Sequence, residues 1–195
     1  MEEDGAATDR WSASTENGTH TMSTQSLSPQ ATSTPARSDS WLWIAFAITR
    51  ILIGFEFLWA FLDKTFGLGF STPTERAWIN GGSPTLGYLS AERGLQDVFQ
   101  PLAGLPIVDI LFMAGLLGVG VGLMAGIAVR LAAVAGMAMM LLMWLASFPI
   151  SPNPFVDYHL VDIFVIAAIA LALPHQRWSL AEPWRKLTKN TAWLQ

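Results

Sequence analysis

Four long apolar blocks constrain the fold of this 195-residue chain more than any other feature. They cover roughly residues 41–66, 105–129, 131–150 and 156–173, and few charges interrupt them. As a helix, each block is about long enough to cross the ~30 Å hydrocarbon core of a bilayer, although the fourth is the shortest. The pattern therefore predicts an all-α membrane protein whose four transmembrane helices form a bundle.

The net negative charge of the chain lies in its first forty residues, outside these blocks. Residues 1–40 contain six acids and two bases, whereas residues 41–195 contain nine of each. The membrane part therefore offers no acidic or basic face, and we expect no nucleic acid as a partner. The chain also has no Cys, which excludes disulfides, thiolate metal sites and covalently attached c-type haem.

The domain organisation follows from the same shift in composition. Fifteen of the first forty residues are Ser or Thr, and apolar residues do not recur there with any period. Such a segment buries too little surface to offset its ordering entropy, so residues 1–40 are expected to form a disordered cytoplasmic tail. Residues 41–180 form the membrane domain, with a long outer loop at 67–104, and residues 181–195 form a C-terminal cytoplasmic tail.

The distribution of Lys and Arg near the ends of the blocks predicts the orientation in the membrane. One side carries Arg37, Arg130, Arg177, Arg185, Lys186 and Lys189. The other side carries Lys64, Arg76 and Arg93. Because cytoplasmic segments are enriched in these residues, we expect a multi-pass protein with both termini in the cytoplasm and a lipid bilayer as its surroundings. The expected location is the cell membrane, which in bacteria is the inner membrane.

The first block contains four charges in the run RILIGFEFLWAFLDK, residues 50–64. A charge at the centre of a membrane helix costs about 2.5–3.5 kcal/mol on insertion scales. Arg50 and Lys64 share one helical face, which is a candidate positively charged surface for binding an anionic substrate. Glu56 and Asp63 share another face, which is a candidate proton path. Structural ion pairs for Arg50 and Glu56, and snorkelling of Lys64 to the headgroups, remain open alternatives.

Polar residues from three blocks are expected at a similar depth near the outer side. They are Asp63, Lys64, Asp109, Asp157, His159 and Asp162. His159 and Asp162 lie three residues apart on one helix, so the carboxylate can reach the imidazole. We interpret His159, Asp162 and Glu56 as candidate proton-handling, catalytic residues. Asp63 and Asp109 join Arg50 and Lys64 as candidate substrate-binding residues.

Other interpretations of this cluster remain open. Asp157 stands at a helix start and fits a solvated N-terminal cap, and a single His is common at a membrane interface. Asp109, His159 and Asp162 are conceivable metal ligands. One His with scattered carboxylates is nevertheless a weak pattern for a metal site, so no metal is expected.

Two further patterns concern packing and the outer loop. Ala114, Gly118, Gly122 and Gly126 recur at steps of four in the second block, which predicts a close helix contact or, alternatively, a groove for a flat ligand. The loop sequence ERAWINGGSPTLGYLS, residues 75–90, contains a turn at its Gly-Gly-Ser-Pro. This loop is either a lid over the outer site or a plain connector.

The chain resembles a known family of membrane proteins. Arg50, Gly54 and Lys64 on the first block, the four-block layout and an Asp-Tyr-His start to the last block resemble the DoxX-type integral membrane proteins. The loop sequence AWINGGSPTLGYL resembles the DoxD-like branch, which includes the membrane subunit of thiosulfate:quinone oxidoreductase. The positions that match the family pattern are Arg50, Gly54, Lys64, Asn80, Gly81, Ser83, Pro84 and His159.

The resemblance implies a four-helix bundle that passes electrons from a small sulfur oxyanion to quinone, and it adds Asn80 and Ser83 to the substrate candidates. A quinone is expected among Phe57, Trp59, Phe61 and the glycine face. Since the chain shows no flavin or haem pattern, another membrane or peripheral redox subunit is an expected partner. A non-catalytic accessory or assembly subunit of a respiratory or redox-defence complex is the alternative. A transporter is less favoured, because the chain shows no inverted halves.

Overall fold

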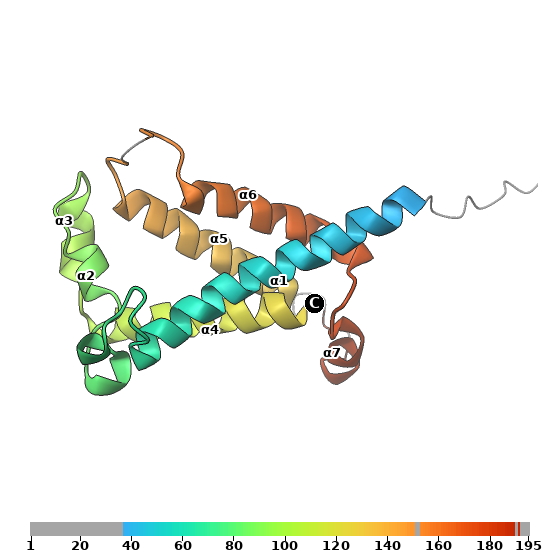
Figure 1. Ribbon diagram of the computed structural model, residues 1–195, viewed down its shortest axis with the longest axis horizontal. Coiled ribbons are helices and arrows are strands. Elements are labelled where there is room, and N and C mark those ends of the chain that lie inside the picture. Colours follow the sequence, from blue (N-terminus) through green and yellow to red (C-terminus); the bar gives the residue numbers. More distant parts are fainter. Residues whose placement is uncertain (1–36, 151–152, 190, 192–195) are drawn as a thin grey trace, which may run out of the picture. The chain divides into compact units, whose positions relative to one another are not determined.

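The four apolar blocks correspond to four helices in a computed structural model that describes residues 37–150, 153–189 and 191. These helices are α1 (Arg37–Phe66), α4 (Pro106–Ala125), α5 (Val129–Ala146) and α6 (Tyr158–Leu171), as Figure 1 shows. The described residues contain helices and loops but no strand. α1, α4 and α5 are long and apolar enough to cross a membrane, whereas α6 is an apolar helix of 14 residues.

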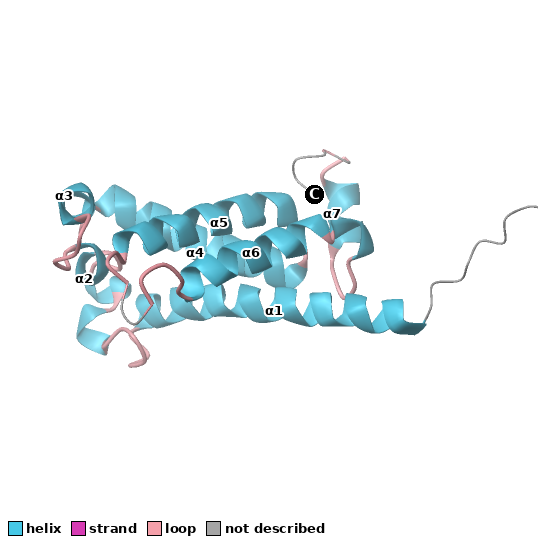
Figure 2. Cartoon of the chain, turned by 90° about the horizontal axis from the view of Figure 1, so that it is seen from above, coloured by secondary structure: helices cyan, strands magenta, loops and turns pink. Residues whose placement is uncertain are grey.

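Short helices occupy the connections. The segment between α1 and α4 contains η1 (Thr74–Arg76), η2 (Trp78–Asn80), α2 (Leu86–Leu89), α3 (Gln96–Phe99) and η3 (Gln100–Leu102). η4 (Leu173–His175) and α7 (Ala181–Leu187) follow α6. Figure 2 shows α2 and α3 at one end of the long helices, hereafter the loop end, and α7 at the other, hereafter the C-terminal end.

The beginning of the first helix differs from the prediction. α1 begins at Arg37, four residues before the expected start at Trp41, and no Gly or Pro in residues 37–40 interrupts it. The rest of the Ser/Thr-rich tail, residues 1–36, lies outside the described residues, and so does the prediction that it is disordered.

The helices pack in a chain of neighbours. α1 makes its most extensive contacts with α4, α5 contacts both α4 and α6, and α6 meets α1 more lightly. Apolar side chains from all four helices form one buried core. Its members are Phe57, Met113, Leu116, Val119, Leu123, Val129, Ala132, Ala133, Met140, Ile166 and Ile169.

Two glycines allow the close contact between α1 and α4. A Cβ placed on Gly54 would lie 2.6 Å from the backbone nitrogen of Met124, and one placed on Gly120 would lie 2.7 Å from that of Leu58. Both helix backbones therefore approach to distances that only glycine permits.

The predicted face of Ala114, Gly118, Gly122 and Gly126 is divided. Gly122 lies at a close contact with α5, since a Cβ there would lie 2.9 Å from the Cβ of Ala132. Ala114 and Gly118 are exposed, and a Cβ on Gly118 would meet nothing within 4 Å.

The turn between α4 and α5 also differs from the predicted boundary. α4 ends at Ala125, because Gly126 adopts a left-handed conformation with φ 68°. Arg130, which was expected to close the second block, is instead the second residue of α5. The helix end is thus fixed by a glycine inside the apolar block and not by the charge that follows it.

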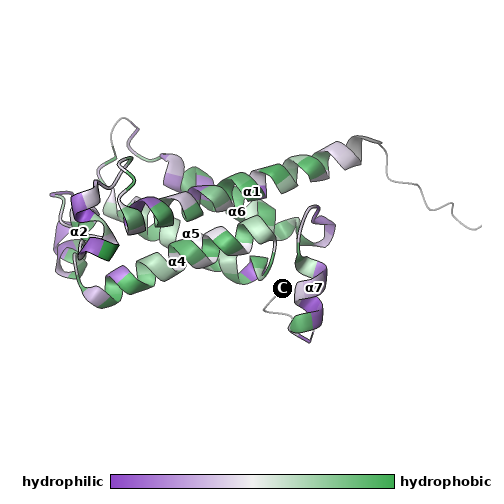
Figure 3. Ribbon diagram, turned by 60° about the horizontal axis from the view of Figure 1, so that its bottom comes forward, coloured by the Kyte–Doolittle hydropathy of each residue, from purple (hydrophilic) through white to green (hydrophobic). Residues whose placement is uncertain are grey.

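The long helices expose large apolar side chains along their lengths. Leu52 of α1, Leu111 of α4, Val134 of α5 and Phe164 of α6 are each more than 60% exposed. Figure 3 shows that hydrophobic colouring predominates on these helices. Water-soluble proteins rarely expose so much contiguous apolar surface. Together with the lengths of α1, α4 and α5, this exposure indicates a membrane protein.

Candidate functional site

Arg50 lies at the C-terminal end of the long helices, far along α1 from Asp63 and Lys64. Its side chain is 2% exposed, and its guanidinium donates hydrogen bonds only to backbone carbonyls. Nη1 bonds to the carbonyl oxygens of Leu123 and Met124, and Nη2 bonds to those of Arg177 and Trp178. Arg50 therefore caps the end of α4 and ties the segment after η4 to it. These bonds explain a buried charge here without an anionic substrate.

Asp63 holds the first turn after α1. Its carboxylate is buried and accepts hydrogen bonds from the backbone N–H groups of Phe70 and Ser71 and from the Ser71 hydroxyl, at 2.6–3.2 Å. Three donors from one turn account for the burial of this charge. The side chain that was predicted to bind substrate has a structural function in this arrangement.

Asp109 joins the long loop to the first turn of α4. Its Oδ1 accepts hydrogen bonds from the Ser83 hydroxyl at 2.9 Å and from the backbone N–H and hydroxyl of Thr85 at 3.1 and 2.5 Å. The Ser83 hydroxyl oxygen also accepts from the N–H of Leu86. Asn80, by contrast, is exposed and donates to the carbonyl of Thr74 within the loop. The hydrogen bonds of Asp109 and Asn80 therefore stabilise the segment between α1 and α4.

His159 is the most deeply buried imidazole of the described residues, with 2% of its surface exposed. Its Nδ1 lies 2.6 Å from Oδ2 of Asp157, which replaces the predicted pairing with Asp162. Asp157 also caps α6, as one interpretation of the sequence expected, because its Oδ1 accepts from the N–H of Leu160. Nε2 of His159 is buried without a hydrogen-bond partner among the described residues. A buried imidazole nitrogen without a partner can accept or donate a proton.

Asp162 and Glu56 are the other two predicted proton-handling residues. The carboxylates of Glu56 and Asp157 both interact electrostatically with Asp162. Asp162 is buried, whereas Glu56 is exposed on α1 ten residues before the helix ends. Within the described part of the chain Glu56 makes no hydrogen bond or ion pair. Asp162 thus lies within electrostatic range of Glu56 and of Asp157, the carboxylate that contacts His159.

Lys64 lines a cavity of about 310 Å³ at the loop end. The other lining residues are Pro84, Thr85, Tyr88, Leu89, Phe99, Leu102, Val108, Leu111, Phe112, Met139, Leu142 and Met143. Lys64 is the only charged residue among them, and its ammonium makes no hydrogen bond or ion pair to a described residue. The volume is within the range of small-molecule sites, and an apolar wall with one cation suits a flat, uncharged head group that accepts hydrogen bonds.

Tyr88 lies between this cavity and the buried imidazole. Its ring lies edge-on to the ring of His159, with 6.5 Å between centroids. Its hydroxyl donates to the carbonyl of Met143 at 2.9 Å and lies 2.5 Å from the hydroxyl oxygen of Ser147. The guanidinium of Arg93 stacks over the same ring. Tyr88 was not among the residues predicted from the sequence, and its phenolic hydroxyl within the loop of residues 75–90 was the signal that could have identified it.

The polar residues predicted to converge therefore meet at one end without forming a single cluster. Asp63 and Asp109 each bind a loop segment, while Asp157, His159, Asp162 and Glu56 form a separate group on α1 and α6. No group of three His, Cys, Asp or Glu side chains in the described ranges is arranged to hold a metal ion. Comparison of the chain with protein-family models, curated proteins and solved structures finds no match in any of the three.

Proposed function

We propose that this chain is a DoxX/DoxD-like membrane subunit that binds a quinone at the loop end and passes electrons to it. The observation that carries the proposal is the apolar cavity with Lys64 as its only charged residue. A quinone head is flat and uncharged, with carbonyl oxygens that accept hydrogen bonds. The Lys64 ammonium can donate to one carbonyl and stabilise the negative charge that forms on reduction.

The proposed location of the quinone differs from the location expected from sequence. Phe57 is buried in the core, and Phe61 packs against that core, so these rings leave no room for a ligand. Trp59 packs against the rings of Phe55 and Phe70. The glycine face of α4, the other part of that expectation, lines a groove of about 510 Å³ that has no charged residue in its lining. The cavity beside Lys64 differs from it by offering a cation that can donate a hydrogen bond.

Reduction of a quinone to a quinol consumes two electrons and two protons. In the proposal, oxidation of two thiosulfate ions to tetrathionate releases the electrons, directly or through a partner subunit. His159, whose Nδ1 is held by Asp157, and the neighbouring Asp162 and Glu56 supply protons from the side of α6. Because the ring of Tyr88 lies between the imidazole and the cavity, His159 affects the supply of protons more than the binding of the quinone.

The binding part of the proposal is tested with the purified full chain in lipid and a short-chain ubiquinone analogue. Lys64→Met is expected to weaken binding of the analogue by about tenfold to a hundredfold, because a charged hydrogen bond is lost. His159→Gln is expected to slow thiosulfate-dependent quinone reduction while changing binding much less. Equilibrium dialysis and the ultraviolet absorbance of the quinone measure the two effects.

Arg76→Gln is the matched control, because Arg76 is an exposed cation in the segment that follows α1 and does not line the cavity. Equal weakening by Lys64→Met and Arg76→Gln would contradict a specific site. Failure of thiosulfate to reduce the analogue, with or without a co-purified partner, would refute the assignment of the electron donor and leave the binding result to stand by itself.

A second candidate function is that of a non-catalytic subunit that assembles a larger membrane complex. The exposed carboxylate of Glu56 supports it, because this group lies about 15 Å from the end of a membrane-length helix. A carboxylate that faces hydrocarbon is costly unless a partner helix neutralises it. A Lys or Arg on a neighbouring subunit would do so.

Glu56→Gln is expected to release such a partner during purification in mild detergent, because the ion pair between the two subunits is lost. The stability of the isolated chain should change little, since Glu56 is exposed. Asp97→Asn, an exposed carboxylate in α3, is the control and should retain the partner. Recovery of the wild-type chain as a free monomer from native membranes would contradict this second function.

A further inference from the structure

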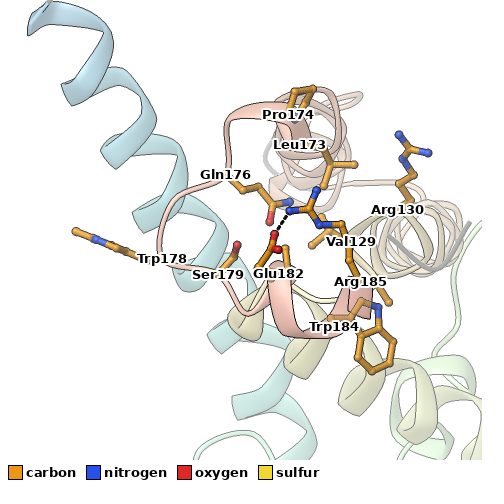
Figure 4. A pocket seen from close by; sticks show the side chains of 13 residues that line it. Val129, Arg130, Leu173, Pro174, Gln176, Trp178, Ser179, Glu182, Trp184 and Arg185 are labelled. Atoms are coloured by element: carbon orange, nitrogen blue, oxygen red, sulfur yellow. Dashed lines mark hydrogen bonds and ion pairs between the residues drawn. The ribbon is translucent and has the colours of Figure 1, made fainter. Parts of the chain in front are cut away.

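A second cavity, of about 420 Å³, lies at the C-terminal end, away from the proposed quinone site. It lies between the start of α5, η4 and α7, and its polar lining includes Arg130, Gln176, Ser179, Glu182 and Arg185. In Figure 4 the guanidinium of Arg185 reaches over the cavity toward Gln176, and Arg130 stands at its edge. Neither the apolar cavity nor the proton-handling group uses any of these residues.

The walls of this cavity are held in place by the buried Arg50. Its bonds to the carbonyls of Arg177 and Trp178 fix the segment between η4 and α7, and the N–H of Leu180 donates to the carbonyl of Ala125 at 2.8 Å. Gly126 is required at this junction, because a Cβ there would lie 2.7 Å from Nη1 of Arg50. The cavity is therefore a preorganised feature of the fold and not a gap between loosely attached segments.

Two lining residues adopt backbone conformations that are unfavourable for their side chains. Trp178 has φ 50° and Ala128 has φ 46°, in a region where residues with a Cβ are uncommon. Such conformations persist where the surrounding structure enforces them, and they concentrate at binding sites. Here the hydrogen bond from Arg50 to the carbonyl of Trp178 enforces one of them.

The electrostatics of the cavity favour an anion. Arg130 and Arg185 line the cavity together with a single lining carboxylate, that of Glu182, which forms an ion pair with Arg185. The formal charges of these three lining side chains sum to +1. Because the Glu182 carboxylate is paired with the Arg185 guanidinium, it competes for that guanidinium with any anion that enters the cavity.

Oε1 of Gln176, a lining residue, is enclosed by protein atoms and has no hydrogen-bond partner among the described residues, so it does not face a ligand in the cavity. A phosphate group matches the guanidinium groups of Arg130 and Arg185 in the lining. Trp178 and Trp184 line the same cavity, and tryptophan is enriched where protein meets lipid headgroups.

We propose that this cavity binds a phosphate group, as in the headgroup of an anionic phospholipid or in free phosphate. Basic pockets between membrane helices recognise such headgroups in other proteins. The site lies at the end that carries Arg177, Arg185, Lys186 and Lys189, which is the predicted cytoplasmic end. Binding there would hold η4 and α7 against the membrane surface, and it does not depend on the proposed quinone chemistry.

The test uses the purified, delipidated full chain in a nonionic detergent at constant ionic strength. Phosphatidylglycerol, phosphatidylcholine and sodium phosphate are the three probes, and native mass spectrometry and thermal unfolding report binding. Phosphatidylglycerol is expected to bind and to raise the unfolding temperature, and phosphatidylcholine is not. Arg185→Ala and Arg130→Ala should each weaken phosphatidylglycerol binding about fivefold.

Two further variants keep the result interpretable. Lys189→Ala removes the same charge from an exposed position that does not line the cavity, and it should change binding less than about twofold. Glu182→Gln removes the competing carboxylate and should tighten binding, an effect that misfolding cannot imitate. Equal losses for Arg185→Ala and Lys189→Ala, or equal affinity for the two lipids, would overturn the proposal.

The sodium phosphate arm identifies the source of the phosphate group. Displacement of phosphatidylglycerol by millimolar phosphate, with the same dependence on Arg185, supports the site and assigns it to free phosphate. Binding of phosphatidylglycerol that phosphate does not displace supports the site and assigns it to a lipid headgroup. The absence of binding by both probes would refute the proposal in either form.

Discussion

Replacement of Arg50 with Ala is expected to lower the free energy of unfolding by about 3–5 kcal/mol, because a buried group with several partners is removed. The variant loses every hydrogen bond from the guanidinium to the carbonyls of Leu123, Met124, Arg177 and Trp178. It also leaves those carbonyls in a region that buries the side chain almost completely. Unfolding of the purified chain in mixed detergent micelles, followed by circular dichroism, measures the loss.

Arg177→Ala is the natural control for this experiment. Arg177 contributes only its backbone carbonyl to the bond with Arg50, and its side chain is exposed. Its substitution should therefore change the free energy of unfolding by less than about 0.5 kcal/mol. Arg50→Lys should be intermediate, because one ammonium cannot reach both pairs of carbonyls. A variant Arg50→Ala as stable as Arg177→Ala would contradict a structural function for Arg50.

Gly54→Ala is expected to destabilise the chain by about 1–3 kcal/mol, because the new methyl group would overlap the backbone of α4. The nearest atom, the backbone nitrogen of Met124, lies 2.6 Å from the position of the added Cβ and cannot move without separating the helices. The same unfolding titration measures this effect as a lower free energy of unfolding.

Gly118→Ala provides the opposite expectation on the same bundle. Its added Cβ meets nothing within 4 Å, so the variant should gain roughly 0.5–1 kcal/mol from the better helix propensity of Ala. Similar effects of Gly54→Ala and Gly118→Ala would contradict the location of the close helix contact. The pair therefore separates packing from propensity without altering any charge.

The sequence predicted the helices well because their signal is local. Long apolar runs specify α1, α4, α5 and α6 without reference to any neighbour, and the unbroken stretch at 37–40 explains why α1 begins early. The glycines that lie at a contact between helices could not be predicted from such local runs. The step-of-four face includes the exposed Gly118 and also Gly122, which contacts α5, whereas Gly54 and Gly120 form the contact between α1 and α4. Only the positions of the neighbouring helices distinguish these glycines.

The partners of the charged residues were harder to predict because most of them are backbone groups. Arg50 was expected to face a side chain on another helix or a ligand, yet it bonds to four carbonyls, which carry no mark in a sequence. Helical spacing likewise suggested Asp162 as the partner of His159. Asp157 takes that position because it stands just before α6 in an extended conformation, where its carboxylate turns toward the helix start.

The short length of α6 has a consequence for the surrounding lipid. Its 14 residues measure about 21 Å, well below the ~30 Å of an average hydrocarbon core. Lipids beside α6 are expected to thin locally to meet this hydrophobic mismatch, whereas those beside α1 are not. Thinning would bring headgroups and water close to Asp157 and His159. The imidazole could then exchange protons with bulk water without a built channel, and the chain would favour thin membranes over thick ones.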